Sequence, residues 1–149
     1  MTLSFPQRLI DCYGAFASGR LPTEQHRYRE LAERGQSPEI KVIGCCDSRV
    51  SPEAIFDAGP GELLVVRNVG NLVPADRADA SIEAAIAFAV DVLQVSSIVV
   101  CGHSSCGAMT ALLSSDRPAD DYLHTWLQRG DAVVHAFDQG RHPVAQAAA

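Results

Sequence analysis

The stretches that decide the fold are residues 97–107, SIVVCGHSSCG, and residues 39–49, EIKVIGCCDSR. Each begins with a short apolar run rich in β-branched residues, and each run ends beside a glycine and a cysteine. Such runs are typical of buried strands, and ligands of open α/β sheets lie beyond the carboxyl ends of the strands. We therefore predict a mostly parallel β-sheet core flanked by helices, with these two segments converging on one edge.

Three soft metal ligands follow the two predicted strands, namely Cys45, His103 and Cys106. A structural zinc site is normally closed by four protein ligands, whereas a catalytic site keeps one position open for water or substrate. The His103 and Cys106 pair alone is weak evidence of metal binding, but Cys45 supplies a third ligand at the same predicted edge. The sequence therefore predicts one catalytic Zn²⁺ per chain.

A carboxylate and a guanidinium lie beside the first ligand. Asp47 and Arg49 are two residues apart and point the same way if the chain is extended there. A carboxylate near a metal can accept a hydrogen bond from water, and an arginine can hold that carboxylate ionised through a bidentate pair. We predict that Asp47 and Arg49 act as a catalytic pair, with an ordinary ion pair as the alternative interpretation.

The composition is that of a single globular domain. The chain has 149 residues, of which 47% are hydrophobic, and a formal net charge of −6. No apolar run approaches the ~20 residues of a membrane span. The acidic balance argues against nucleic acid and anionic membranes as partners.

The cysteines indicate a reducing compartment. Their number, five, is odd, and they lack the even, spread pattern of a small secreted domain. Residues 1–8 lack the basic flank and apolar stretch of a signal peptide. We therefore expect a cytoplasmic protein, in which Cys12 and Cys101 serve as packing residues. Cys46 is expected to pack in the same way, with oxidation or a disulfide that inactivates the site as the alternative.

Helical patterns fill the rest of the chain. The second predicted helix opens with Thr23 and stops at Gly35, a usual helix end. The third is apolar all round, which predicts a buried crossover helix between two parallel strands. The predicted helices span residues 6–19, 23–34, 79–93, 107–115, 122–128 and 131–139, with a turn or loop at 116–120.

The motif C-x-D-S-R at 45–49, followed by G-H-S-x-C-G at 102–107, resembles the β-class carbonic anhydrases. The resemblance extends through residues 35–38, 61–74 and 81–90 and covers roughly residues 5–113. It implies zinc on Cys45, His103 and Cys106, water or hydroxide as the fourth ligand, and reversible hydration of carbon dioxide to bicarbonate and a proton by zinc-bound hydroxide.

The resemblance also implies a substrate pocket. Gln36 matches an amide that hydrogen-bonds substrate, and the backbone N–H of Gly107 matches a second donor. Val69 and Phe88 match apolar walls, with Phe88 where tyrosine is common, and Leu64 stands where phenylalanine is frequent. Because two thiolates neutralise the charge of Zn²⁺, its water should be less acidic than at a three-histidine site, so activity should rise toward alkaline pH.

The expected organisation is one β-carbonic anhydrase-like domain over residues 1–149. It comprises an N-terminal helical arm at 1–35, a zinc-site core at 36–113 and a C-terminal helical segment at 114–149. Family members carry a further strand near the C-terminus, which is predicted to be missing here. An uncovered sheet edge invites association, and β-class enzymes are built from dimers, so we expect a homodimer or tetramer.

Other function classes fit less well. A tyrosine-phosphatase loop needs an arginine six residues after its cysteine, but Ser51 and Pro52 stand at that spacing. Thioredoxin-like chemistry needs C-x-x-C, whereas Cys45 and Cys46 are adjacent. Two alternatives stay open: a carbon disulfide or carbonyl sulfide hydrolase on the same fold, and a catalytically silent zinc-binding protein.

Overall fold

The computed structural model describes residues 4–74, 79–114 and 122–138. The chain divides into two compact units, Met1–Ser37 and Pro38–Ala149. The loop predicted at 116–120 and the tail from residue 139 onward lie outside the described residues. The assignment of all 149 residues to one domain stays a prediction.

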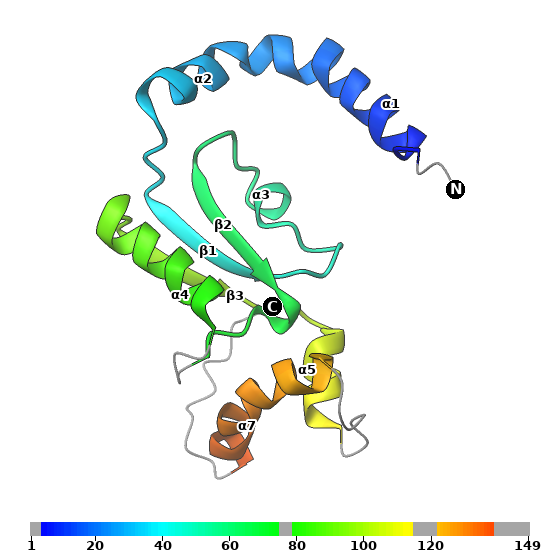
Figure 1. The fold of residues 1–149 in the computed structure, drawn as a ribbon, viewed down its shortest axis with the longest axis vertical. Coiled ribbons are helices and arrows are strands. Elements are labelled where there is room, and N and C mark those ends of the chain that lie inside the picture. The colour runs from blue at the N-terminus through cyan, green and yellow to red at the C-terminus, as the bar shows by residue number, and fades with distance from the viewer. Residues whose placement is uncertain (1–3, 75–78, 115–121, 139–149) are drawn as a thin grey trace. The chain divides into compact units, whose positions relative to one another are not determined.

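The N-terminal unit is one helical run. It comprises α1 (Gln7–Ala15), a π-helical turn η1 (Phe16–Arg20) and α2 (Leu21–Arg34) (Figure 1). The predicted separation into two helices is wrong, because residues 20–22 are helical. Thr23 does not cap a new helix, since its hydroxyl donates to the Arg20 carbonyl at 2.7 Å. Gly35 ends the run as predicted, with φ at 79°.

The helical run has no core of its own. No residue of α1, η1 or α2 is buried. Its aromatic side chains contact one another, with ring centroids 6.2 Å apart between Phe16 and Tyr28. Tyr13 nevertheless remains 67% exposed and Leu9 52% exposed. The unit therefore presents apolar surface that its own residues do not cover.

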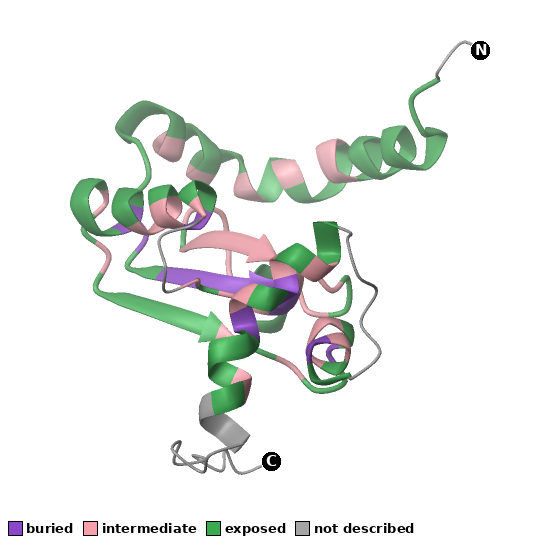
Figure 2. Ribbon diagram, turned by 60° about the horizontal axis from the view of Figure 1, so that its bottom comes forward, coloured by how far each residue is buried: buried purple, intermediate pink, exposed green. Residues whose placement is uncertain are grey.

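The second unit contains a parallel sheet. Its strands are β1 (Ile40–Cys45), β2 (Leu63–Asn68) and β3 (Ser97–Cys101), in the order β2-β1-β3. Both predicted strands are confirmed as β1 and β3. In the register, Ile43 pairs with Val66 on one side and Val100 on the other. The central strand β1 forms the core of the sheet (Figure 2).

Burial is concentrated in β1. Val42 and Ile43 are each 1% exposed, and full burial of such a side chain stabilises the fold by about 1.5–3 kcal/mol. Lys41 is also 1% exposed, and desolvation lowers the pKa of its ammonium group. By contrast, β3 lies at the edge of the sheet, where Val100 is 54% exposed.

The crossover from β2 to β3 passes through η2 (Val69–Asn71), α4 (Ala80–Ala87) and the π-helical turn η3 (Phe88–Val92). The crossover is as predicted, but complete burial of its helix is wrong. Ile82 and Ala89 are its buried residues. Phe88, Val90 and Val92 of η3 are 42%, 47% and 63% exposed, so within the described residues one face of this helix is uncovered.

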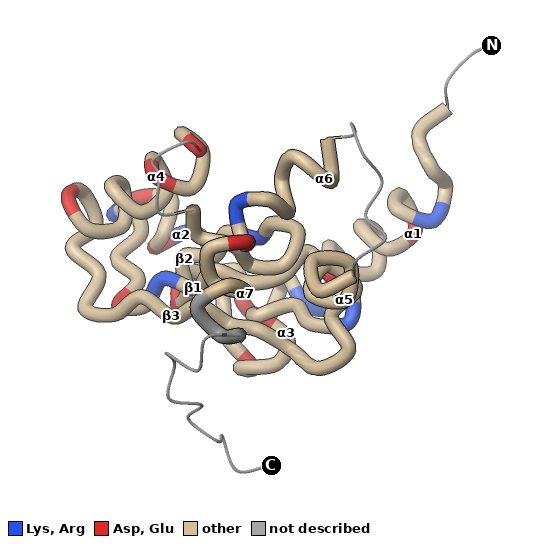
Figure 3. Tube along the Cα trace, turned by 90° about the horizontal axis from the view of Figure 1, so that it is seen from below, with Lys and Arg blue, Asp and Glu red and all other residues tan. Residues whose placement is uncertain are grey.

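Capping and charge define the ends of this crossover helix. Asp79 caps α4 by accepting hydrogen bonds from the backbone N–H groups of Ser81 at 2.9 Å and Ile82 at 3.2 Å. Between residues 79 and 93 the charged residues are all acidic, namely Asp79, Glu83 and Asp91, and acidic positions are coloured red along α4 in Figure 3. A carboxylate at Asp79 also complements the positive end of the helix dipole.

Short helices complete the second unit. Leu112 and Leu127 are each 3% exposed and belong to a small core between α5 (Gly107–Leu113) and α6 (Tyr122–Leu127). The helices predicted at 122–128 and 131–139 are confirmed within the described residues, whereas the helix predicted at 107–115 ends at Leu113, because the backbone of Ser114 is extended. Across the described part of the chain, no helix combines the length and the apolar character needed to cross a membrane. The helices are α3 (Pro52–Ile55), α5 (Gly107–Leu113), α6 (Tyr122–Leu127), η4 (Gln128–Gly130) and α7 (Asp131–Asp138).

Candidate metal centre and active site

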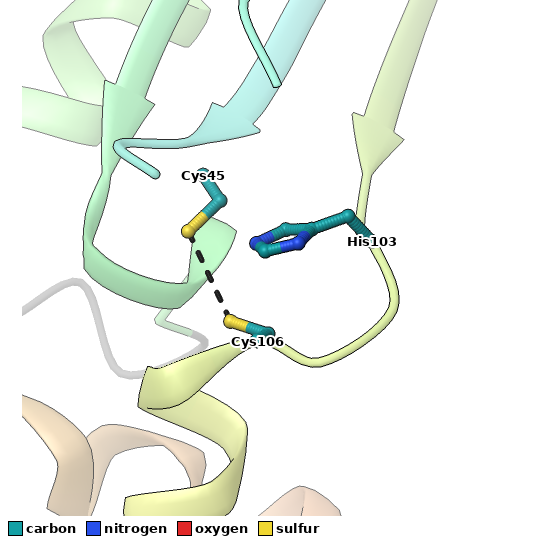
Figure 4. Close-up of side chains that lie close together, drawn as sticks. All are labelled: Cys45, His103 and Cys106. Carbon is teal, nitrogen blue, oxygen red and sulfur yellow. Dashed lines mark hydrogen bonds between the residues drawn. The ribbon is translucent and has the colours of Figure 1, made fainter. Parts of the chain in front are cut away.

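The carboxyl ends of β1 and β3 bring the three predicted ligands together. Cys45 is the last residue of β1, and His103 follows β3 by two residues. Cys106 is the residue from which α5 begins. The turn between them places Ser105 at a φ of 52°, which few residues other than glycine adopt. This tight turn directs His103 and Cys106 toward Cys45 (Figure 4).

The cluster has the geometry of a metal site. The ligand atoms of Cys45, His103 and Cys106 all lie within 4.8 Å of one another. The two sulfurs are 3.9 Å apart, a separation that two ligands of one ion can adopt. Both cysteines are buried. The sequence prediction that these residues converge is therefore confirmed in the geometry.

The histidine ring is oriented for ligation. Its Nδ1 lies 2.9 Å from the Ser104 carbonyl oxygen. A carbonyl only accepts, so Nδ1 carries the proton and Nε2 keeps its lone pair. Within the described residues, Nε2 is buried and has no hydrogen-bond partner. A buried acceptor beside two sulfurs and without a partner fits a metal ligand.

Hydrogen bonds favour the thiolate form of Cys45. Burial raises the pKa of this thiol, but the hydrogen bond from the backbone N–H of Asp47 lowers it. The backbone N–H of Gly70 and the side chain of Cys106 act in the same direction. The net effect lowers the pKa of Cys45 from 9.0 to about 7. A thiolate is the form of cysteine that binds metal.

Asp47 and Arg49 form the predicted pair. The Arg49 guanidinium donates to both carboxylate oxygens of Asp47, at 2.9 and 2.7 Å, and its backbone N–H adds a third bond at 3.0 Å. These bonds hold the pKa of Asp47 well below its usual range and raise that of Arg49. Asp47 Oδ2 lies 3.9 Å from His103 Nε2. The carboxylate is therefore ionised and adjacent to the ligand cluster.

Two arginines join the segments of the site. Arg49 donates to the Ser105 carbonyl at 3.1 Å, which ties the loop after β1 to the loop after β3. Arg67, at the end of β2, donates to the carbonyls of Cys45 at 2.9 Å and Asp47 at 2.7 Å. Arg49 is predicted from its place beside Asp47, whereas Arg67 is not predicted, because a contact between neighbouring strands leaves no local motif.

The predicted substrate residues are dispersed over several elements. Leu64 lies on β2 and is half-buried, whereas Phe88 lies on η3 and is 42% exposed. Gly107 directly follows Cys106, at the start of α5. Val69 lies in η2. The remaining predicted residue, Gln36, belongs to the N-terminal unit. The substrate roles of all five stay predictions.

A cavity of about 370 Å³ lies beside the loop that follows β2. Its lining includes Cys46, Arg67, Val69 and Trp126. In the part of the chain that the structure describes, Val69 is the only predicted pocket residue that lines it. Trp126 donates its indole N–H to the Val69 carbonyl at 2.7 Å. The sequence offered no signal for this contact, which spans two distant segments.

Comparison with known proteins identifies the family. The sequence profile of the carbonic anhydrase family matches residues 40–148. A solved β-carbonic anhydrase from Coccomyxa, in complex with acetazolamide, superposes with a TM-score of 0.81 at 31% identity. The match covers 96% of this chain and 63% of that one. The chain belongs to the β-class carbonic anhydrases.

Other members agree in sequence and fold. A carbonic anhydrase of Synechococcus elongatus is 37% identical over 85% of this chain and 47% of its own length. One of two tetrameric β-carbonic anhydrases of Sordaria macrospora gives a TM-score of 0.78 at 33% identity, over 94% of this chain and 70% of that one. The chain thus spans about half the length of the curated relatives that it matches. The predicted family and fold class are confirmed.

Proposed function

We propose that this protein catalyses the zinc-dependent reversible hydration of carbon dioxide to bicarbonate. The observation that carries the proposal is the unpartnered Nε2 of His103 beside the sulfurs of Cys45 and Cys106. Zinc held by these three side chains would supply Lewis-acid activation of water at neutral pH. The family's general reaction is the hydration of carbon dioxide, which needs this chemistry.

Asp47 is proposed to position the reacting water. Its carboxylate is kept ionised by the guanidinium of Arg49, so it accepts a hydrogen bond and orients the water's lone pair toward the substrate. Arg49 is the positioning partner, because its link to the Ser105 carbonyl fixes the carboxylate relative to the ligand loop. The hydrogen bonds from Arg49 therefore orient the Asp47 carboxylate as an acceptor for the reacting water.

We further propose that Val69, Leu64 and Phe88 supply apolar contacts for carbon dioxide. The amide of Gln36 and the backbone N–H of Gly107 are proposed to hydrogen-bond its oxygens. Carbon dioxide is linear and carries no net charge, so apolar walls with a few donors suit it. From the resemblance to the β-class we also propose the division of the domain. It comprises an arm at 1–35, a zinc core at 36–113 and a helical segment at 114–149.

The working form is proposed to be a homodimer or tetramer. The N-terminal unit exposes Phe5, Leu9, Ile10 and Tyr13, each 49–67% accessible, and has no buried residue in its helices. Apolar surface of this kind is characteristic of interaction sites. The tetrameric relative from Sordaria macrospora is consistent with such self-association. A cytoplasmic location stays a prediction from the cysteine pattern.

The test is stopped-flow measurement of carbon dioxide hydration by protein of known zinc content, from about pH 6.5 to about pH 9. We expect about one zinc per chain and a rate that rises toward alkaline pH. Cys106→Ser should retain less than about a tenth of the zinc and of the rate, because a ligand is lost. Cys101→Ser is the matched control and should behave as wild type.

Three outcomes would contradict the proposal. Zinc-loaded wild-type protein without turnover would indicate a silent zinc-binding protein. Turnover of carbon disulfide or carbonyl sulfide in the absence of carbon dioxide hydration would indicate the alternative hydrolase. A rate that is flat across the pH range would contradict the proposed ionisation of water at this site.

A further inference from the structure

Arg67 reaches from the end of β2 to the segment that carries the first metal ligand. It pairs with Gly44 in the register of β1 and β2. An added Cβ at Gly44 would lie 3.8 Å from Arg67 Cγ, so the stem of the arginine packs against this glycine. The guanidinium donates from Nε to the Cys45 carbonyl at 2.9 Å and from Nη2 to the Asp47 carbonyl at 2.7 Å. One side chain thus holds the backbone on both sides of Cys46.

The ladders of the sheet end where these carbonyls begin. The ladder between β1 and β3 ends at Gly44, one residue before the ligand. The ladder between β1 and β2 ends at Cys45, and the Cys46 N–H adds one further bond to the Asn68 carbonyl at 2.9 Å. The Arg67 guanidinium therefore continues the attachment of this segment to β2 past the end of the ladder.

The other bonds of the turn after β1 leave its position on the sheet open. The Val50 N–H donates to the Asp47 carbonyl at 3.2 Å, and the Arg49 N–H donates to the Asp47 carboxylate at 3.0 Å. Both bonds lie within the turn and would move with it. The bond from Arg49 to the Ser105 carbonyl ties the turn to another loop and not to a strand. The bonds from Arg67 anchor the turn to the sheet.

We propose that Arg67 is a positioning residue that sets the place of the Cys45 sulfur relative to the Asp47 carboxylate by holding the backbone of both residues. The inference rests on the proposed function, since it assigns a support to the same zinc site. The two donor nitrogens belong to one rigid plane, so they fix the two carbonyls relative to each other. Because both bonds end on carbonyl oxygens, Arg67 acts through the backbone and not on a ligand atom.

The first experiment measures zinc affinity by competition with a chelator. Arg67→Ala removes both donors. Loss of an outer support of a metal ligand typically weakens affinity by about 10–100-fold, and we expect a change in this range. Arg29→Ala is the control, because Arg29 is an exposed arginine of α2. Its zinc affinity should stay within about twofold of wild type, as for an ordinary surface substitution.

Chemical rescue separates positioning from general destabilisation. Arg67 lines the cavity of about 370 Å³, so removal of its side chain leaves space that a free guanidinium ion can enter. We expect millimolar guanidinium to restore most of the zinc affinity of Arg67→Ala, and the same concentration of sodium to restore none. Guanidinium weakens folded proteins in general, so a gain in global stability would not explain the recovery.

A spectroscopic measurement reports the ligand geometry directly. In cobalt-substituted protein, the ligand-field bands depend on how the ligands are arranged around the metal. We expect these bands to shift in Arg67→Ala and not in Arg29→Ala.

Arg67→Lys decides the matter if Arg67→Ala does not fold. Lysine keeps the positive charge but offers one donor nitrogen in place of the two-nitrogen fork. Loss of one hydrogen bond to a charged group corresponds to about tenfold, and we expect the zinc affinity of Arg67→Lys to fall by about this factor.

Wild-type zinc affinity in Arg67→Ala, or in Arg67→Lys if only that variant folds, would overturn the proposal. Weakened affinity would support it if the cobalt bands shift or guanidinium restores the affinity, and would overturn it if neither occurs. None of these readouts requires turnover. Zinc-loaded wild-type protein that fails to hydrate carbon dioxide would overturn the proposed function, and the affinity measurements would still decide the role of Arg67.

Discussion

Replacement of Gly70 by alanine should strongly destabilise the second unit. Gly70 is buried, has a φ of 76° and would place a Cβ 2.8 Å from Met109 Cε. The left-handed conformation costs a residue other than glycine about 1–2 kcal/mol. Insertion of a methyl group into a packed interior costs about 1–3 kcal/mol. The sum is about 2–5 kcal/mol, a large part of the ~5–15 kcal/mol that stabilises a typical domain.

The assay is urea unfolding of metal-free protein, with chelator present so that zinc binding does not contribute. With a urea dependence of about 2 kcal/mol per molar, in the middle of the usual range, the midpoint should fall by about 1–2.5 M. Gly14→Ala is the control. Gly14 lies in α1, and no atom lies within 4 Å of its added Cβ. Alanine there should leave stability unchanged or raise it by up to about 1 kcal/mol.

A double variant separates the two causes. Shortening Met109 to alanine removes the atom nearest to the added Cβ, so the combined substitution of Gly70 and Met109 should cost less than the sum of the single substitutions. The cost of the left-handed backbone should remain. If Gly70→Ala unfolds within about 0.5 kcal/mol of wild type, the argument from backbone conformation and packing at this loop is wrong.

Two further predictions concern ionisation and capping. Folding lowers the pKa of Cys45 from 9.0 to about 7. The ionised thiolate therefore stabilises the folded state fully above the unfolded pKa, and this stabilisation is lost as pH falls through about 7. Between pH 9 and pH 6, metal-free wild type should lose roughly 2–3 kcal/mol of unfolding free energy relative to Cys45→Ser, as measured by urea unfolding. Equal pH dependence in both proteins would contradict this assignment. Asp79→Ala should lower the unfolding free energy by about 1 kcal/mol, because the cap of α4 is lost. Asp79→Asn should keep most of the wild-type stability, because asparagine also caps helices. Equal stability of the two variants in urea unfolding would exclude the cap.

Local signals identified the strands and the ends of some helices. The β-branched run of β1 and the apolar run of β3 formed strands because such residues fit a pleated, buried sheet. Gly35 ended its helix because it adopts a positive φ. By contrast, residues 20–22 continued a helix that local pattern predicted to be interrupted. The π-helical turn η1 leads directly into α2, and Pro22 lies in the first turn of α2, where a proline is tolerated.

The crossover helix shows the limit of composition as a guide to burial. Its residues are apolar all round, yet Phe88 is 42% exposed and Val92 is 63% exposed. Apolar content indicates a surface that can be buried. Whether it is buried depends on what packs against it, and the described residues cover one face of the helix. Quaternary contacts of the kind proposed above are a physical means of covering the other.

The sequence by itself determined the chemistry of the site. The ligand types of Cys45, His103 and Cys106 and the charges of Asp47 and Arg49 are local properties, and their places at strand ends follow from the topology of parallel sheets. Only the tertiary structure decided how these groups are oriented. The bond from His103 Nδ1 to a carbonyl leaves Nε2 as the acceptor, and the bond from Arg49 to the Ser105 carbonyl holds the loop after β1 against the loop after β3. Such orientations depend on contacts between distant segments, and the pattern of neighbouring residues in the sequence does not predict these contacts.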